Sequence, residues 1–328
     1  HLWGEEFSYI FSILQNGQLG QLYYGKRLRD REDFDRMLLL SRRDMAPCVF
    51  EGNSIFSMDD IKQEYPVYGN GDLRYMACEI QSPDGSRASD FKYVSHRIYD
   101  GKPVLKGLPC TYVENEKEAE TLEIVLTDSV LDTDMILSYT VYAEYPALVR
   151  NVRFVCRSEK NLKLVKAMSM NLDLADSDYE MMDFAGAWGR ERYVKKQKLH
   201  VGIQSIYSLR GHSSHQFNPF LMLKRPETVE NSGEVIGVSL IYSGNFLGQV
   251  EVDNYHVTRL MMGIHPEGFA WNLTNGTEFQ TPEAVMVYSN QGMNYMSQVF
   301  HKLYRTRLAR GYWRDKARPI LVNNWEAT

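Results

Sequence analysis

The sequence contains few cysteines and no long apolar run. Its four cysteines, at positions 48, 78, 110 and 156, lie far apart. They show neither the two-residue spacing of zinc or redox pairs nor the density of a small disulfide-rich domain, so we expect them to be reduced. No run of about 18 apolar residues could span a bilayer, and the first residues, HLWGEEFSYI, lack the basic and apolar segments of a signal peptide. We therefore expect no membrane partner and a cytoplasmic location.

An excess of positive charge is also missing. The net charge is -5 and the isoelectric point is near 6.0, whereas a nucleic-acid-binding protein needs a basic surface to neutralise phosphates. We therefore expect no nucleic-acid partner and a neutral or weakly polar substrate. Apolar residues make up 44% of the chain and charged residues 24%. These values are typical of globular proteins and argue against disorder or a coiled coil.

No motif for a metal or a cofactor is complete. His212 and His215 have a spacing seen in metal sites, but no third ligand accompanies them. The acidic segment 173–183 lacks the ligand spacing and the central glycine of an EF-hand, and GQLG at 17–20 lacks the third glycine of a dinucleotide-binding loop. The sequence predicts neither a metal nor a cofactor.

Apolar and polar residues alternate over much of the chain. Leu122, Ile124 and Leu126 follow a period of two, as do apolar residues within 135–141 and 152–156. This pattern predicts half-buried antiparallel strands, and turn sequences such as PDG at 83–85 separate the runs at short intervals. We predict a mainly β protein built as a large sandwich of two sheets.

The pattern changes near the C-terminal end. Helical spacing begins after Tyr288, with apolar residues at Met293, Met296, Phe300 and Leu303. It predicts one amphipathic helix over 291–310, with Ser289 or Asn290 as its N-cap. The segment RPILVNNW at 318–325 then indicates a buried strand without partner strands in this chain. We expect the chain to be the N-terminal part of a longer protein.

Seven short motifs follow one another in an informative order. They are QEYPVYG (63–69), YVSHRIY (93–99), GLPCTYV (107–113), GAWGRER (186–192), SSHQFNPF (213–220), YRTRLAR (304–310) and RPILVNNWEAT (318–328). Together they resemble the N-terminal part of bacterial α-galactosidases of glycoside hydrolase family 36. The resemblance covers nearly the whole chain, and the last motif is similar to the signature that opens the catalytic barrel of that family.

The resemblance implies a large two-sheet antiparallel β-supersandwich over residues 1–288, a linker helix in 289–313 and the first strand of a (β/α)8 barrel in 314–328. It also implies a homotetramer, in which the supersandwich packs on the protein's own barrel. The implied activity is hydrolysis of terminal α-galactosyl residues from melibiose, raffinose and related oligosaccharides, with retention of configuration. Retention needs two carboxyls about 5–5.5 Å apart. In this family both are barrel aspartates, which we expect beyond Thr328, so the chain alone should be inactive.

The resemblance implies two sugar contacts within this chain. Trp325 ends the expected barrel strand, where its indole would lie against the apolar face of galactose; it could also plug the mouth of the barrel. Asp44 resembles an aspartate that projects from an N-terminal loop and accepts hydrogen bonds from galactose hydroxyls. Without the family, an aspartate that follows two arginines is more often part of a local ion pair of little energy.

Other interpretations stay open. The main alternative is a stand-alone carbohydrate-binding β-sandwich without catalysis, although such a module would not need the unpaired strand that ends at Trp325. Within the family, the choice between α-galactosidase and α-N-acetylgalactosaminidase, or between hydrolysis and transfer to sugar acceptors, depends on residues outside the chain. The stretch 188–192 within the GAWGRER motif is compatible with a buried ion-pair corner or with a subunit contact.

Overall fold

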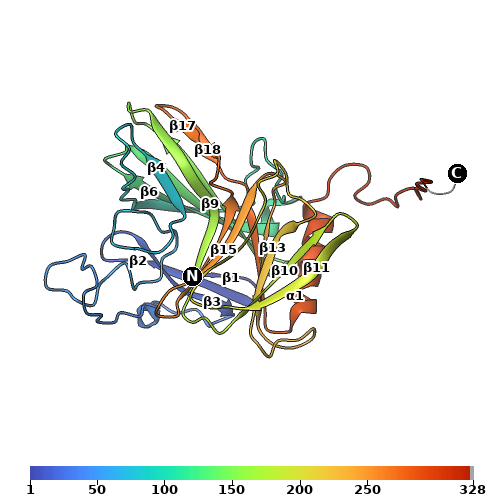
Figure 1. The fold of residues 1–328 in the computed structure, drawn as a ribbon, viewed down its shortest axis with the longest axis horizontal. Helices are drawn as coiled ribbons and strands as arrows, with labels where there is room; N and C mark the ends of the chain where they lie inside the picture. Colours follow the sequence, from blue (N-terminus) through green and yellow to red (C-terminus); the bar gives the residue numbers. More distant parts are fainter. Residues whose placement is uncertain (326–328) are drawn as a thin grey trace.

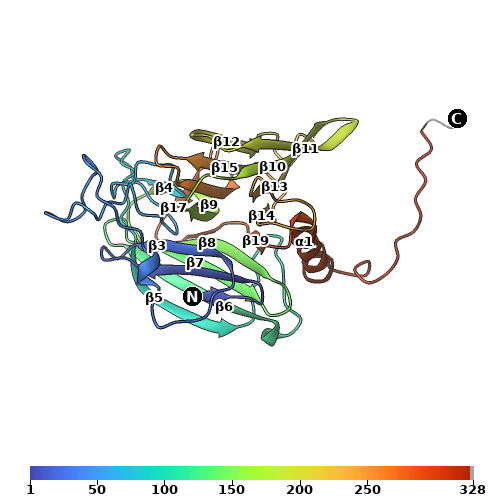
Figure 2. The ribbon, with the colours of Figure 1, turned by 90° about the horizontal axis from the view of Figure 1, so that it is seen from below.

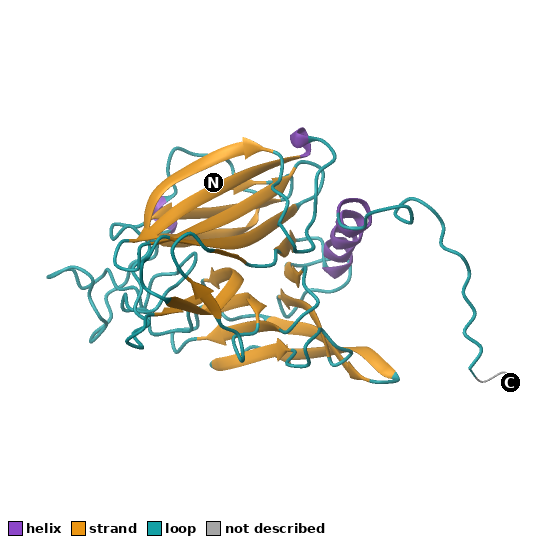
Figure 3. Ribbon diagram, turned by 90° about the horizontal axis from the view of Figure 1, so that it is seen from above, coloured by secondary structure: helices purple, strands orange, loops and turns teal. Residues whose placement is uncertain are grey.

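The structure, a computed structural model, describes residues 1–325 (Figure 1). Two large antiparallel sheets lie one above the other, and the helix lies at one end of them (Figure 3). A small N-terminal sheet adjoins them and consists of β1 (Leu2–Trp3), β2 (Phe7–Ile13) and β3 (Leu19–Lys26). The predicted mainly β fold with two large sheets and one C-terminal helix is confirmed.

The larger sheet has ten strands. Across the sheet they run β11 (Arg190–Lys198), β10 (Glu180–Ala187), β13 (Phe217–Lys224), β14 (Val235–Leu240), β19 (Ala284–Ser289), β8 (Ala147–Cys156), β7 (Thr133–Tyr142), β6 (Ala119–Asp128) and β5 (Lys92–Asp100), while β18 (Glu278–Gln280) also pairs with β8. Some neighbouring strands, such as β8 and β19, are far apart in the sequence. Local sequence patterns therefore cannot predict the order of the strands.

The second sheet has six strands. They run β12 (Gly202–Tyr207), β15 (Phe246–Val252), β16 (Thr258–Ile264), β9 (Leu162–Leu174) and β17 (Trp271–Leu273), and β4 (Cys78–Gln81) also pairs with β9. Two 3-10 turns, η1 (Asp35–Met37) and η2 (Glu116–Glu118), lie outside the sheets.

The predicted alternation sets the register of the strands. Leu122 of β6 lies opposite Tyr139 of β7, and Ile124 lies opposite Leu137. All four side chains face the main core and are at least nine-tenths buried. The residues between them, such as Ser138, face the other side of the sheet. The strand predictions over 122–126, 135–141 and 152–156 are therefore confirmed.

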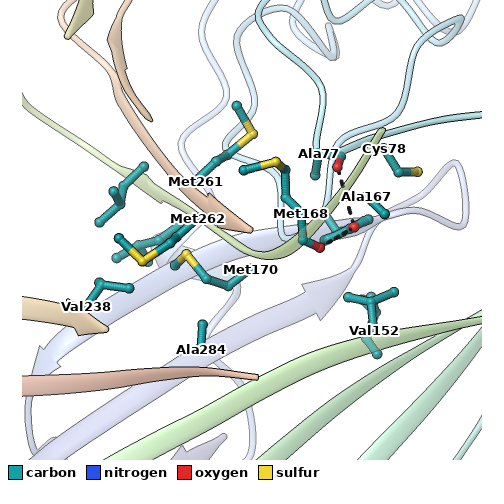
Figure 4. Packing of buried hydrophobic residues seen from close by; sticks show 14 of the residues in the cluster. Ala77, Cys78, Val152, Ala167, Met168, Met170, Val238, Met261, Met262 and Ala284 are labelled. Carbon is teal, nitrogen blue, oxygen red and sulfur yellow. Dashed lines mark hydrogen bonds between the residues drawn. The ribbon is translucent and has the colours of Figure 1, made fainter. Parts of the chain in front are cut away.

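Methionines contribute to the main core on both faces of the smaller sheet. Met168 and Met170 of β9 and Met261 and Met262 of β16 are completely buried (Figure 4). Flexible thioethers fit irregular gaps in such a core. Cys78 is also buried in this core, and burial raises the pKa of its thiol. Cys78, Cys110 and Cys156 are buried free thiols, and Cys48 is an exposed one.

Helix α1 (Met293–Arg307) packs on the outer face of the larger sheet. It can come close because residue 237 of β14 is glycine, where a Cβ would lie 2.6 Å from Met296 Sδ. The helix prediction is confirmed, but the N-cap prediction was wrong. Gly292 occupies that position without a side-chain hydrogen bond, and the carbonyls of Val229 and Glu230 accept from the first helical amides instead. No helix within residues 1–325 is long and apolar enough to cross a membrane.

The expected strand over residues 320–325 is not formed. These residues have no strand partner in the described part of the chain, and Ile320, Leu321 and Trp325 are 97%, 90% and 81% exposed. A parallel strand obtains its hydrogen bonds and its burial from neighbouring strands, and residues 1–325 supply none here. Residues 326–328, the end of the RPILVNNWEAT motif, lie outside the described residues.

Candidate functional site

Asp44 lies in the long segment between β3 and β4, outside the sheets. The blue part of this segment forms loops at the left of Figure 1. Its side chain is 92% exposed, and its carboxylate lies 3.8 Å from the Arg42 guanidinium. An ion pair this exposed contributes little energy. The carboxylate can therefore accept hydrogen bonds from a ligand with hydroxyl groups.

Arg43, the next residue toward the N-terminus, points back to the protein. Its Nη1 lies 2.5 Å from Asp60 Oδ1, and the Asp60 side chain is almost completely buried. The guanidinium also lies over the Tyr255 ring, 3.4 Å from the ring centroid. Burial raises the pKa of the Asp60 carboxyl, and the Arg43 charge opposes that rise. Sequence reasoning missed this anchor because its three residues are far apart in the chain.

Buried ion pairs hold the segment that follows Asp60. Arg259 Nε and Nη2 donate to Asp173 at 2.9 and 2.8 Å, and Arg259 Nη2 also donates to Asp72 at 2.8 Å. Arg74 joins the cluster by donating from Nε to Asp72 at 2.9 Å. Although burial by itself would raise the pKa of Asp173, the Arg259 guanidinium holds it below its ordinary value. Buried charges need such partners, so the cluster fixes the base of the Asp44 segment.

A second buried cluster joins the N-terminal sheet to the sandwich. Arg150 Nη2 lies 2.6 Å from Glu64 Oε1, and both side chains are at least 98% buried. The hydroxyls of Tyr9 and Tyr139 donate to the same carboxylate at 2.7 and 2.8 Å. Glu64 belongs to the QEYPVYG motif, yet no sequence pattern indicated Arg150 as its partner. Both clusters have a structural role.

Trp325 lies in the tail that follows α1. The start of this tail is attached to the segment before η2. Arg314 Nη1 donates to the Tyr112 hydroxyl at 2.8 Å. The Tyr112 amide also donates to the carbonyl of Arg307, the last residue of α1, at 2.8 Å. Beyond these contacts the chain extends away from the sheets (Figure 2). In residues 1–325 Trp325 therefore contributes to no closed pocket.

The structure does not bring Asp44 and Trp325 together. The blue segment that carries Asp44 and the red tail that ends near Trp325 lie at opposite ends of the longest axis in Figures 1 and 2. The prediction that both contact one galactose is thus not tested by this chain. The separation of the two segments nevertheless limits how a longer protein could bring both residues to one galactose.

The other motifs show no metal-binding arrangement. Among residues 1–325 no group of three or more histidine, cysteine, aspartate or glutamate side chains is placed to hold a metal ion. Two carboxylates of the acidic segment 173–183 form separate ion pairs: Asp173 pairs with Arg259, and Asp176 pairs with Arg225. The GAWGRER motif forms the tip of the β10–β11 hairpin, where Trp188 is 88% exposed. A buried ion-pair corner is therefore excluded for this motif.

Comparison with protein families identifies both parts of the chain. Residues 17–274 match the model described as the glycosyl hydrolase family 36 N-terminal domain, and residues 278–328 match the model described as melibiase. The first match alone covers more than half of the chain.

Individual proteins show the same similarity. The chain is 48% identical over all its 328 residues to alpha-galactosidase AgaA of Geobacillus stearothermophilus, and 40% identical over an alignment of 334 residues to alpha-galactosidase Mel36A of Lactobacillus acidophilus. It spans 45% of the length of each. The crystal structure of a doubly substituted variant of AgaA in complex with raffinose superposes with a TM-score of 0.97 over 100% of this chain and 46% of that one. An alpha-galactosidase of Lactobacillus brevis superposes with a TM-score of 0.97 at 39% identity, over 99% of this chain and 44% of that one.

Proposed function

The chain belongs to glycoside hydrolase family 36, and from this we propose that it is the non-catalytic N-terminal portion of a retaining α-galactosidase. The observation that carries the proposal is the 48% identity to alpha-galactosidase AgaA over the entire chain. Substituted variants of AgaA have been crystallised in complex with raffinose and with stachyose. We therefore propose terminal α-galactosyl residues of melibiose, raffinose and related oligosaccharides as the substrate.

In this proposal, the residues that catalyse the hydrolysis follow Thr328 in the longer protein. A retaining glycosidase uses one carboxylate to attack the anomeric carbon and a second carboxylic acid to protonate the leaving oxygen. Both would stand on later strands of a (β/α)8 barrel, at the C-terminal ends where such barrels carry their active sites. The present chain would support that barrel and shape the sugar pocket.

The exposed tail supports the barrel over the stand-alone carbohydrate-binding module. Ile320, Leu321 and Val322 are each at least 79% exposed. Consecutive apolar residues rarely remain exposed in a finished protein, and a first barrel strand would bury them. We propose that residues 314–328 become that strand once the remaining strands are present.

Asp44 and Trp325 keep their proposed roles as galactose contacts. A carboxylate accepts hydrogen bonds from two hydroxyls at once, and an indole stacks on an apolar sugar face. Since the segment that carries Asp44 and the tail that carries Trp325 lie at opposite ends of the molecule's longest axis, a shared galactose requires two copies of the protein or a tail that folds back across it. We propose that the protein is a cytoplasmic homotetramer, and the first arrangement would be compatible with such an oligomer.

The test is the stereochemistry of melibiose hydrolysis by the full-length protein, followed by proton NMR. Release of α-galactose before mutarotation is expected. Initial release of β-galactose, or no hydrolysis of melibiose or raffinose, would contradict the proposal.

A further inference from the structure

A groove of about 810 Å³ lies on the face of the ten-stranded sheet that is turned away from the main core. Its floor consists of β5 to β8, which contribute residues that alternate with core residues, such as Ser138 between Leu137 and Tyr139. Its walls are the segments 103–108 and 264–271, together with β18. β17 and β18 mark its place at the upper left of Figure 1.

One wall of the groove is aromatic. The rings of Trp271 and Phe279 have centroids 5.2 Å apart, and those of Phe269 and Phe279 are 5.3 Å apart. Phe279 is buried and packs against both other rings, whereas Trp271 is 46% exposed. The packing thus holds an indole in a fixed position with part of its surface in the groove.

The floor is polar, and its charges are paired. Arg97 Nε donates to Glu123 Oε2 at 2.8 Å, and the Tyr99 hydroxyl donates to Glu123 Oε1 at 3.1 Å. Burial and the neighbouring Glu123 carboxylate raise the pKa of Tyr99 to about 12, so its hydroxyl remains a donor at neutral pH. A charged ligand would find little uncompensated charge here. A carboxylate still has acceptor positions left after two such bonds.

One polar group of the floor has no partner. Ser138 is 4% exposed, and its Oγ has no hydrogen-bond partner among the described residues. A buried hydroxyl without a partner is unfavourable, so such groups are commonly satisfied by a ligand or by water. Ser138 lines the groove between the Glu123 and Asn151 side chains of the adjacent strands.

We propose that this groove binds a neutral oligosaccharide, with one sugar ring stacked on Trp271 and its hydroxyls bonded to Glu123 and Ser138. An exposed indole beside charge-paired polar groups suits a ligand that has apolar C–H faces and many hydroxyls but no charge. The choice of a saccharide among neutral polar ligands rests on the proposed function. The groove itself rests on the geometry.

The probe is sucrose, which an α-galactosidase does not cleave, so turnover does not disturb the titration. Binding to the full-length protein is followed by saturation-transfer NMR for the wild type, Trp271→Ala and Trp271→Phe. Trp188→Ala, at the exposed hairpin tip, is the matched control. We expect saturable millimolar binding that Trp271→Ala weakens about tenfold, that Trp271→Phe weakens less, and that Trp188→Ala leaves unchanged.

Hydrolysis of p-nitrophenyl α-galactoside by the same variants separates this proposal from the proposed function. Sucrose binding that depends on Trp271, in a protein without hydrolytic activity, would support the groove and contradict the proposed function. An active enzyme that does not bind sucrose saturably, for instance because the rest of the protein covers the groove, would overturn the groove proposal. Equal affinities for the wild type and Trp271→Ala would overturn it as well.

Discussion

Arg43 forms an ion pair of 2.5 Å with the buried Asp60, while the carboxylate of the adjacent Asp44 is exposed. Adjacent residues of one loop therefore have opposite roles, since Arg43 fixes the loop to the sandwich and Asp44 faces solvent. The sequence identified the exposed residue, Asp44, through its resemblance to an aspartate of the family. It could not identify the anchor, because Tyr255 and Asp60 are brought to Arg43 only by the fold.

Replacing the anchor should weaken substrate binding without removing any group that touches the sugar. In the full-length protein, Arg43→Met is expected to raise KM for melibiose about tenfold, because a displacement of about 1 Å can cost that much or more. Arg42→Met is the matched control, since Arg42 is 73% exposed. Equal KM values for both variants, measured by steady-state kinetics, would contradict a positioning role for Arg43.

The two proposed sugar contacts should each be needed for full activity. A hydrogen bond to a charged acceptor contributes about 1.5–3 kcal/mol, so Asp44→Ala should lower kcat/KM for melibiose by roughly one to two orders of magnitude. Trp325→Ala should lower it by about tenfold. Unchanged kinetics with melibiose for both variants would remove Asp44 and Trp325 from the sugar site.

Mixed oligomers of these two variants distinguish the two ways of bringing the residues together. If the loop of one copy meets the tail of another, reassembly of Asp44→Ala copies with Trp325→Ala copies leaves roughly a quarter of the pockets intact, and activity recovers accordingly. If the tail folds back within one copy, every pocket keeps one defect. Activity then stays at the level of the single variants.

The cluster around Asp173 should be essential for stability. Removing one partner of a buried ion pair leaves the other charge uncompensated and costs about 3–5 kcal/mol. Asp173→Asn should therefore lower the free energy of unfolding by about that amount in urea titrations. Asp90→Asn, which breaks the exposed pair with Lys92, should cost less than about 1 kcal/mol. Similar losses for both variants would contradict the importance of the buried cluster.

The attachment of α1 should depend on pH through Glu118. Arg307 Nε and Nη2 donate to its carboxylate at 2.8 and 3.0 Å, and these bonds hold the pKa of Glu118 below its ordinary value of 4.5. A lowered pKa in the folded state adds stability above the ordinary value, and this stability is lost as the pH falls through the folded pKa. The difference in thermal midpoint between the wild type and Glu118→Gln should be largest near pH 6.

This difference should shrink as the pH falls below 4.5 and through the lowered pKa of the folded state, because protonation of Glu118 removes the charge that Arg307 contacts. Glu116→Gln, two residues away on the same turn, is the control for a general effect of removing a carboxylate. A wild-type advantage over Glu118→Gln that is constant from pH 6 to pH 3 would show that the Arg307 contact does not contribute through its charge.

Local patterns predicted the elements of the fold well. The alternation at Leu122, Ile124 and Leu126 specified a strand face, and the helical spacing from Met293 specified α1, because both periods follow from backbone geometry. The order of the strands in the sheets, in contrast, could not be predicted from local patterns. The pairing of β8 with β19 joins residues about 135 positions apart, and no local pattern encodes it.

The remaining misses have physical causes. The helix N-terminus is capped by carbonyls of a distant turn at Val229 and Glu230, which a search for a local capping side chain cannot find. The strand predicted over 320–325 has the right composition for burial, but strand formation depends on neighbours that residues 1–325 do not include. The domain limits at 288 and 313 remain predictions.

The most direct test compares residues 1–328 alone with the full-length protein in the hydrolysis of p-nitrophenyl α-galactoside. If the carboxyl pair lies in the barrel, the full-length protein should reach a kcat/KM of about 10⁴ M⁻¹s⁻¹ or more, and the isolated chain should release no nitrophenol above the uncatalysed rate. Turnover by the isolated chain that a second round of purification does not remove would contradict the account.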